Sequence, residues 1–118
     1  MRTRLLAACA AAFLNMAHGQ SAVPPPKTWT TCAACHAARG AAAIGPPLAG
    51  VVGRKAGSSP GFGYSRAMKN AQLTWDDKSL AAFLSDPQQA VPGNRMPFAG
   101  VPDPGEVAEL VKYLKTLR

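Results

Sequence analysis

The chain has 118 residues, a length that suits one domain rather than two. It carries 13 Lys and Arg against 6 Asp and Glu, which gives a formal net charge of +7. Such a charge attracts acidic proteins, anionic membranes or nucleic acid. The basic residues are dispersed, however, and their longest cluster is Arg54-Lys55. A nucleic-acid-binding protein is therefore not expected.

Residues 1–19 have the layout of a secretory signal peptide. Two arginines among the first four residues precede an apolar stretch over residues 5–14, and small residues then lead to a cleavage site before Gln20. A cut after Ala22 is the second option. The apolar stretch is far shorter than the roughly 20 residues that a membrane-spanning helix needs. We therefore expect an exported, periplasmic protein with no integral membrane segment after cleavage; a retained N-terminal helix is the alternative.

The mature part divides into a Pro-rich lead-in with the start of the first helix, residues 20–31, and a domain over residues 32–118. Pro24–Pro26 should be extended, because proline fixes φ and has no amide donor. Removal of the two arginines of the signal lowers the formal charge from +7 to +5. A domain of about 100 residues buries only a modest core, so a prosthetic group would help to stabilise it.

The first helices are predicted from turn signals and apolar spacing. A short helix is expected over about residues 27–38 and another over residues 64–70, separated by a loop-rich stretch at residues 41–61. Thr74 is expected to cap a third helix, whose first turn carries two aspartates that suit its positive end. This helix should stop before Pro87.

A loop is predicted over residues 90–102, and the last helix follows it. Asp103 is its expected cap, Pro104 suits its first turn, and Glu106 stands three residues after the cap. The apolar residues then recur at three- and four-residue spacing, as in an amphipathic helix: Val107, Leu110, Val111, Leu114 and Leu117. Since no segment sustains the period-two alternation of a strand, the fold is expected to be all-α.

Cys32, Cys35 and His36 form a Cys-x-x-Cys-His motif, the pattern of covalent c-type haem attachment. Two thiols three residues apart on a helical turn reach the two vinyl groups of one porphyrin, and the adjacent histidine directs a ring nitrogen at the iron. A redox-active disulfide is one alternative, but no βαβ pattern surrounds the cysteines. Zinc is another, but only scattered carboxylates offer further ligands. The motif predicts one covalently bound haem c, with its iron, per chain.

From Cys32 to Leu117 the chain resembles the class I cytochromes c. The resemblance implies a compact all-α fold, with three to five helices and long loops wrapped around one covalent haem. Residues 45–50, Gly-Pro-Pro-Leu-Ala-Gly, resemble the family's Gly-Pro-x-Leu-x-Gly loop. By that match, the Pro46 carbonyl accepts a hydrogen bond from the second ring nitrogen of His36. Such a contact fixes the tautomer of a ligating histidine and raises its basicity.

The same resemblance assigns Arg54, Tyr64 and Trp75 to the buried haem propionates. Carboxylates inside a small protein need cationic and neutral hydrogen-bond donors, so the residue types suit this role. A surface arginine and two core aromatic residues are the alternative interpretation.

Residues 91–98, Val-Pro-Gly-Asn-Arg-Met-Pro-Phe, resemble the family's sixth-ligand loop. Residue type alone would not choose between Met68 and Met96, since most methionines fill cores. The resemblance implies that Met96 is the sixth ligand of the iron and that Asn94 belongs to the haem-binding residues. Met68 is then expected to pack near the haem edge.

Two departures from the family pattern stand out. The family usually has a longer N-terminal helix before the haem motif, and here Trp29 is expected to supply its aromatic contact against Leu110 and Leu114 of the last helix. Phe83 stands where the family has an internal tyrosine, which removes a hydroxyl near Met96.

An imidazole and a thioether as axial ligands favour reduced iron relative to two imidazoles, and they leave no open position for a substrate. The resemblance therefore implies an electron-transfer protein, not an enzyme, that carries single electrons through a low-spin haem. Its partners would be redox proteins with acidic docking surfaces, such as a dehydrogenase, a reductase or a terminal oxidase. Basic residues near the haem edge would meet them: Lys27, Arg39, Lys55, Lys69 and Arg95.

Two other functions stay open at this point. A free carrier would be a monomer. The first alternative is a dedicated cytochrome subunit of a periplasmic dehydrogenase, which the short N-terminal part favours. A haem peroxidase or gas sensor is the third possibility, and it requires that Met96 is absent from the iron or easily displaced.

Overall fold

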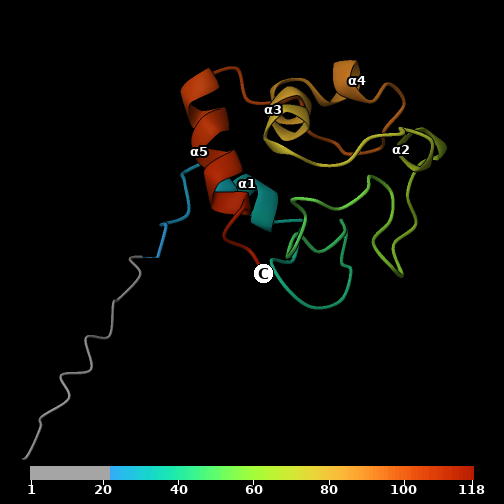
Figure 1. Ribbon diagram of the computed structural model, residues 1–118, viewed down its shortest axis with the longest axis horizontal. Coiled ribbons are helices and arrows are strands. Elements are labelled where there is room, and N and C mark those ends of the chain that lie inside the picture. The colour runs from blue at the N-terminus through green and yellow to red at the C-terminus, as the bar shows by residue number, and fades with distance from the viewer. Residues whose placement is uncertain (1–21) are drawn as a thin grey trace, which may run out of the picture.

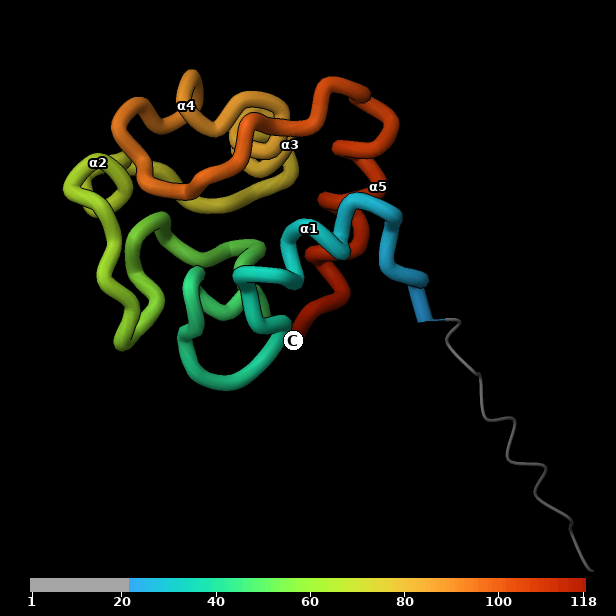
Figure 2. The backbone as a smooth tube through the Cα atoms, turned by 180° about the vertical axis from the view of Figure 1, so that it is seen from behind, coloured from blue at the N-terminus to red at the C-terminus, as the bar shows by residue number. Residues whose placement is uncertain are grey.

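The computed structural model describes residues 22–118, and the predicted signal peptide lies outside the described residues. Five helices are present in this part: α1 (Trp29–Ala33), α2 (Arg66–Lys69), α3 (Asp77–Ser85), α4 (Pro87–Ala90) and α5 (Pro104–Leu114). Figure 1 shows α3 and α4 on one side of the molecule and the loops of residues 37–63 on the other. Seen from behind in Figure 2, α1 lies beside α5 at one end, and α2 lies at the opposite end.

The predicted all-α fold is confirmed. Within residues 22–118, β-type pairing is limited to one antiparallel bridge between Lys55 and Thr74. None of the helices in this part has the length and apolar character that crossing a membrane would require.

α5 begins as the sequence predicts. The Asp103 carboxylate accepts hydrogen bonds from the backbone N–H groups of Gly105 and Glu106 at 3.2 and 3.3 Å, and Pro104 occupies the first turn. The apolar stripe of the helix is buried, and Leu110 has no exposed surface. Complete burial of one such side chain contributes about 2 kcal/mol. Leu117 lies beyond the helix but is buried as well, so the stripe continues into the C-terminal turn.

The expected cap of α3 is wrong: Asp76, not Thr74, is the N-cap. The Asp76 carboxylate accepts from Ser79 N–H at 2.7 Å, and the Ser79 hydroxyl accepts from Asp76 N–H at 2.9 Å, which completes a capping box. The hydrogen bonds from Ser79 lower the pKa of the Asp76 carboxyl. Trp75, which would be the first helical residue after a Thr74 cap, is instead paired through its backbone with Gly53 and Arg54 at 2.7 and 2.9 Å, so the helix begins later.

α4 falls within a stretch for which no helix was predicted. Asp86 ends α3 and caps α4, with its carboxylate accepting from Gln89 N–H at 3.1 Å. Pro87 stops α3, as expected, but it also occupies the first position of the next helix, where proline is favoured.

α1 is shorter than the predicted helix over residues 27–38. One further helical turn follows it, because His36 N–H donates to the Cys32 carbonyl at 2.9 Å. Trp29 contacts the last helix, as expected, but its aromatic partner there is Tyr113, which was not predicted: the two rings meet edge-to-face, with centroids 4.9 Å apart.

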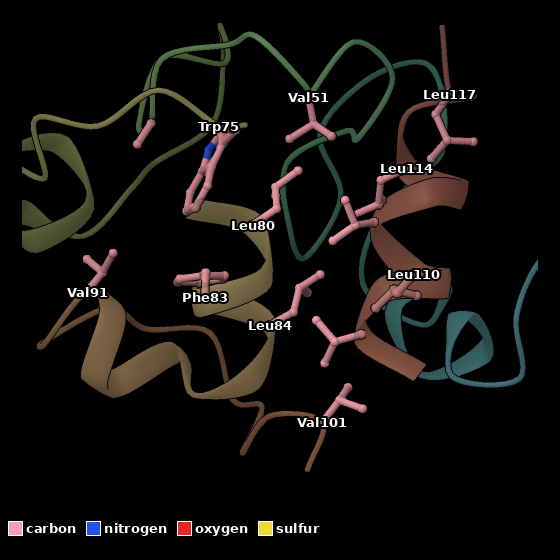
Figure 3. Packing of buried hydrophobic residues seen from close by; sticks show 13 residues of the cluster. Val51, Trp75, Leu80, Phe83, Leu84, Val91, Val101, Leu110, Leu114 and Leu117 are labelled. Atoms are coloured by element: carbon pink, nitrogen blue, oxygen red, sulfur yellow. The ribbon is translucent and has the colours of Figure 1, made fainter. Parts of the chain in front are cut away.

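One apolar cluster holds these elements together. Figure 3 shows side chains of α3, such as Leu80 and Leu84, directed toward Leu110 and Leu114 of α5. Trp75 lies edge-to-face on Phe83 of α3, with ring centroids 5.0 Å apart. Several partly buried apolar side chains pack against this core: Cys32, Leu48, Met68, Met96 and Phe98 among them. The haem-motif helix and the predicted sixth-ligand loop thus contact the same core.

Candidate cofactor site

The His36 imidazole is held by a loop that lies against its own backbone. Gly45 N–H donates to the Cys35 carbonyl at 2.9 Å, and Leu48 N–H donates to the Ala37 carbonyl at 3.0 Å. Between them, the Pro46 carbonyl lies 2.8 Å from His36 Nδ1. A carbonyl can only accept, so Nδ1 carries the proton and the lone pair of Nε2 is free to bind a metal. The contact expected for Pro46 is therefore present.

Gly45 is buried and permits this close approach. A Cβ atom at this position would lie 2.6 Å from His36 Cε1 and 2.7 Å from Nδ1. Only glycine lets the loop reach the ring without moving it.

Cys32 and Cys35 are free, partly buried thiols. Burial raises the pKa of the Cys32 thiol, and a weak hydrogen bond from Sγ to the Thr28 carbonyl, at 3.6 Å, orients it. Among residues 22–118 there is no cluster of three or more His, Cys, Asp or Glu able to hold a metal ion. The zinc interpretation therefore lacks ligands in the described part of the chain.

The loop of residues 91–98, called here the Met96 loop, is fixed by the buried side chain of Asn94. Its Nδ2 donates to the carbonyls of Pro87 and Val91, both at 2.9 Å, and its Oδ1 accepts from Met96 N–H at 2.9 Å. The Asn94 amide thus joins the loop to α4 at Pro87 and places the backbone of Met96. Direct contact of Asn94 with haem stays a prediction.

Arg54, Tyr64 and Trp75, the residues assigned to the propionates, each make a hydrogen bond with a loop residue of the chain. Trp75 N–H donates to the Arg54 carbonyl at 2.9 Å. Arg54 Nη2 donates to the Pro47 carbonyl at 2.9 Å, so this arginine also supports the loop that holds His36. The Tyr64 hydroxyl accepts from Ser59 N–H at 3.1 Å. Their contact with a carboxylate stays a prediction.

The residues present fit a covalently attached haem. Two thiols lie beside an imidazole whose Nε2 is free, and a half-buried thioether packs on the same core as Cys32. Thiols, imidazole and thioether are the donor set of a c-type haem protein.

Comparison with known proteins agrees with this chemistry. The family model described as "Cytochrome c" matches residues 26–118. "Cytochrome c2 iso-2" of Magnetospirillum molischianum is 46% identical over 94 residues, which cover 79% of this chain and 97% of that protein. "Cytochrome c2" of Rhodomicrobium vannielii is 39% identical over 121 residues, with 98% of this chain and 97% of that protein covered.

A solved structure, "cytochrome cH from Methylobacterium extorquens", superposes with a TM-score of 0.73 at 44% identity and covers 76% of this chain and 92% of that one. The chain belongs to the cytochrome c family. It is a class I monohaem c-type cytochrome with covalently attached haem c, and an electron-transfer protein rather than an enzyme.

The roles of α4 and of Gln88 were not predicted from the sequence; the Gln88 side chain contacts the Met96 loop. A signal for the helix was present: Asp86-Pro87 repeats the cap and first position that Asp103-Pro104 provides for α5. Nothing comparable marked Gln88, because its hydrogen bonds depend on the path of the loop.

Proposed function

We propose that this protein is an exported single-electron carrier in which His36 and Met96 are the axial ligands of a low-spin haem iron. The hydrogen bond from His36 Nδ1 to the Pro46 carbonyl carries the proposal, because it directs the bare Nε2 away from the loop as a metal ligand. When bound, the haem supplies an iron that gains and loses one electron.

The residues of the chain would attach the porphyrin, complete the coordination of the iron and bind the propionates. Cys32 and Cys35 would hold the porphyrin through thioether bonds, and Met96 would close the sixth position against water and external ligands. A thioether there raises the reduction potential. Arg54, Tyr64 and Trp75 would donate to the propionates.

The visible spectrum of the exported protein tests this proposal. We expect the periplasmic fraction of an expressing bacterium to contain a chain that keeps its haem on a denaturing gel. The oxidised form should show the weak far-red band of sulfur-to-iron charge transfer, and the reduced form should be low-spin. Mass spectrometry should find cleavage before Gln20. A high-spin spectrum would instead indicate an open position and a peroxidase or gas sensor, and a chain without haem would refute the proposal.

Docking to acidic partners is supported by the distribution of charge. All six acidic residues lie after residue 75, and five of them cap a helix or lie in its first turn: Asp76, Asp77, Asp86, Asp103 and Glu106. The loops of residues 37–63 and α2 carry only basic charges. Lys55 and Lys69 are exposed on adjoining segments there, because Gly57 packs against the backbone of α2.

Charge reversal on this surface should slow reaction with an anionic oxidant. At low ionic strength, Lys55→Glu with Lys69→Glu is expected to lower the rate of oxidation of the reduced protein by hexacyanoferrate about tenfold, since electrostatic steering acts at that scale. Added salt should diminish the difference. Lys112→Glu on α5 is the control and should change the rate much less. Equal effects at both places would contradict a docking surface on the loop side.

A further inference from the structure

α4 is a single turn that is firmly anchored between α3 and the Met96 loop. Pro87, its first residue, is almost completely buried, and the Asp86 carboxylate caps the turn. α4 also packs against α3. The turn is therefore a fixed support from which a side chain can hold the loop that follows.

Gln88 provides such a contact with both ends of its amide. Its Nε2 donates to the Asn94 carbonyl at 2.9 Å, and its Oε1 accepts from Gly93 N–H at 3.2 Å. Gly93 adopts a left-handed conformation with φ of +87°, and its N–H and the carbonyl of the next residue both face the Gln88 amide. One side chain thus binds two consecutive residues of the loop.

Hydrogen bonds of Asn94 connect Gln88 to Met96. Gln88 fixes the backbone carbonyl of Asn94, while the Asn94 side chain binds α4 at the Pro87 carbonyl and accepts from Met96 N–H. Movement of Met96 away from its place would strain or break these bonds together. Cooperative loss makes such a network more resistant to opening than one bond would be.

We propose that Gln88 is a positioning residue for Met96 and that the Gln88 side-chain amide slows the opening of residues 93–96. This inference rests on the proposed ligation of the iron by Met96. A donor and an acceptor are both needed, and they must lie on one neutral group. Methionine is similar in length but supplies neither, and glutamate keeps only the acceptor.

The rate at which imidazole enters the oxidised holoprotein tests the proposal, because at saturating imidazole this rate equals the rate of loop opening. Gln88→Met is expected to raise it about tenfold, the factor that one or two neutral hydrogen bonds provide. Gln88→Glu should lie between this variant and the unchanged protein. Gln89→Met is the matched control, because Gln89 is also exposed on α4 and its side chain makes no hydrogen bond with the described residues. The control should stay within about twofold.

The far-red charge-transfer band distinguishes a failure of the proposed role of Gln88 from a failure of the proposed ligation by Met96. The band is expected in the unchanged protein and in both methionine variants, since Gln88 does not bind iron. If the band is present and Gln88→Met admits imidazole at the unchanged rate, the role of Gln88 is refuted while Met96 stays the ligand. If the unchanged protein lacks the band, ligation by Met96 and the role of Gln88 are refuted together.

Discussion

Met96→Ala is expected to keep its haem through Cys32 and Cys35 but to lose the far-red charge-transfer band and to lower the reduction potential. The thioether favours reduced iron, and alanine leaves the sixth position open. External ligands then no longer compete with a tethered sulfur, so the affinity for cyanide or carbon monoxide should rise about a hundredfold. Ligand titration and potentiometry of the purified holoprotein measure these changes.

Met68→Ala is the matched control for this experiment. Met68 is also partly buried against the core, so its truncation removes packing as the Met96 substitution does. We expect a loss of stability of about 2 kcal/mol or more, with the band and the potential retained. A Met96→Ala protein that keeps its potential and still refuses cyanide would show that Met96 is not the ligand.

Gly45→Ala is expected to lower the free energy of unfolding by disturbing the loop that holds the His36 ring. The added methyl group would overlap the His36 ring, which has little freedom to move because Pro46 holds Nδ1. Either the ring shifts or the loop withdraws, and both break the hydrogen bond. We expect a loss of about 3 kcal/mol from the free energy of unfolding, combining overpacking with the lost hydrogen bond.

The control for this substitution is Gly63→Ala. A Cβ at Gly63 would meet no atom within 4 Å, so the same change in backbone freedom occurs without overlap. Guanidinium unfolding and the potential of both holoproteins measure the effect. Equal midpoints and equal potentials in the two variants would contradict a tight fit between Gly45 and the ring.

Local chemistry made part of this structure predictable. Asp103-Pro104 identified the start of α5 because a cap and a first-turn proline act within a few residues. The Cys-x-x-Cys-His spacing predicts the attachment site for the same reason, because its three residues lie within one helical turn of one another. The all-α class followed from the lack of period-two alternation. The compact class I fold and the Pro46 contact came from resemblance, since residues ten positions apart have no local rule that joins them.

Long-range pairing accounts for what the sequence analysis missed. Thr74 is a suitable cap by residue type, but the backbone of the next residue, Trp75, pairs with the distant Gly53 and Arg54, so no helix can start there. Tyr113 as the partner of Trp29 depends on how α1 meets α5. Gln88 is an exposed residue of a single helical turn, and only the left-handed turn at Gly93 places a backbone donor within its reach.

The separate uses of acidic and basic residues bear on how such a carrier adapts to new partners. Five of the six carboxylates cap a helix or lie in its first turn, so changing them would cost stability. By contrast, the side chains of Arg39, Lys55 and Lys69 form no hydrogen bond or ion pair with the described residues. Mutations at these cations leave the folded framework intact. On the proposed docking through these cations, selection can retune partner choice by changing surface charge, while the elements that hold His36 and Met96 stay under a separate constraint.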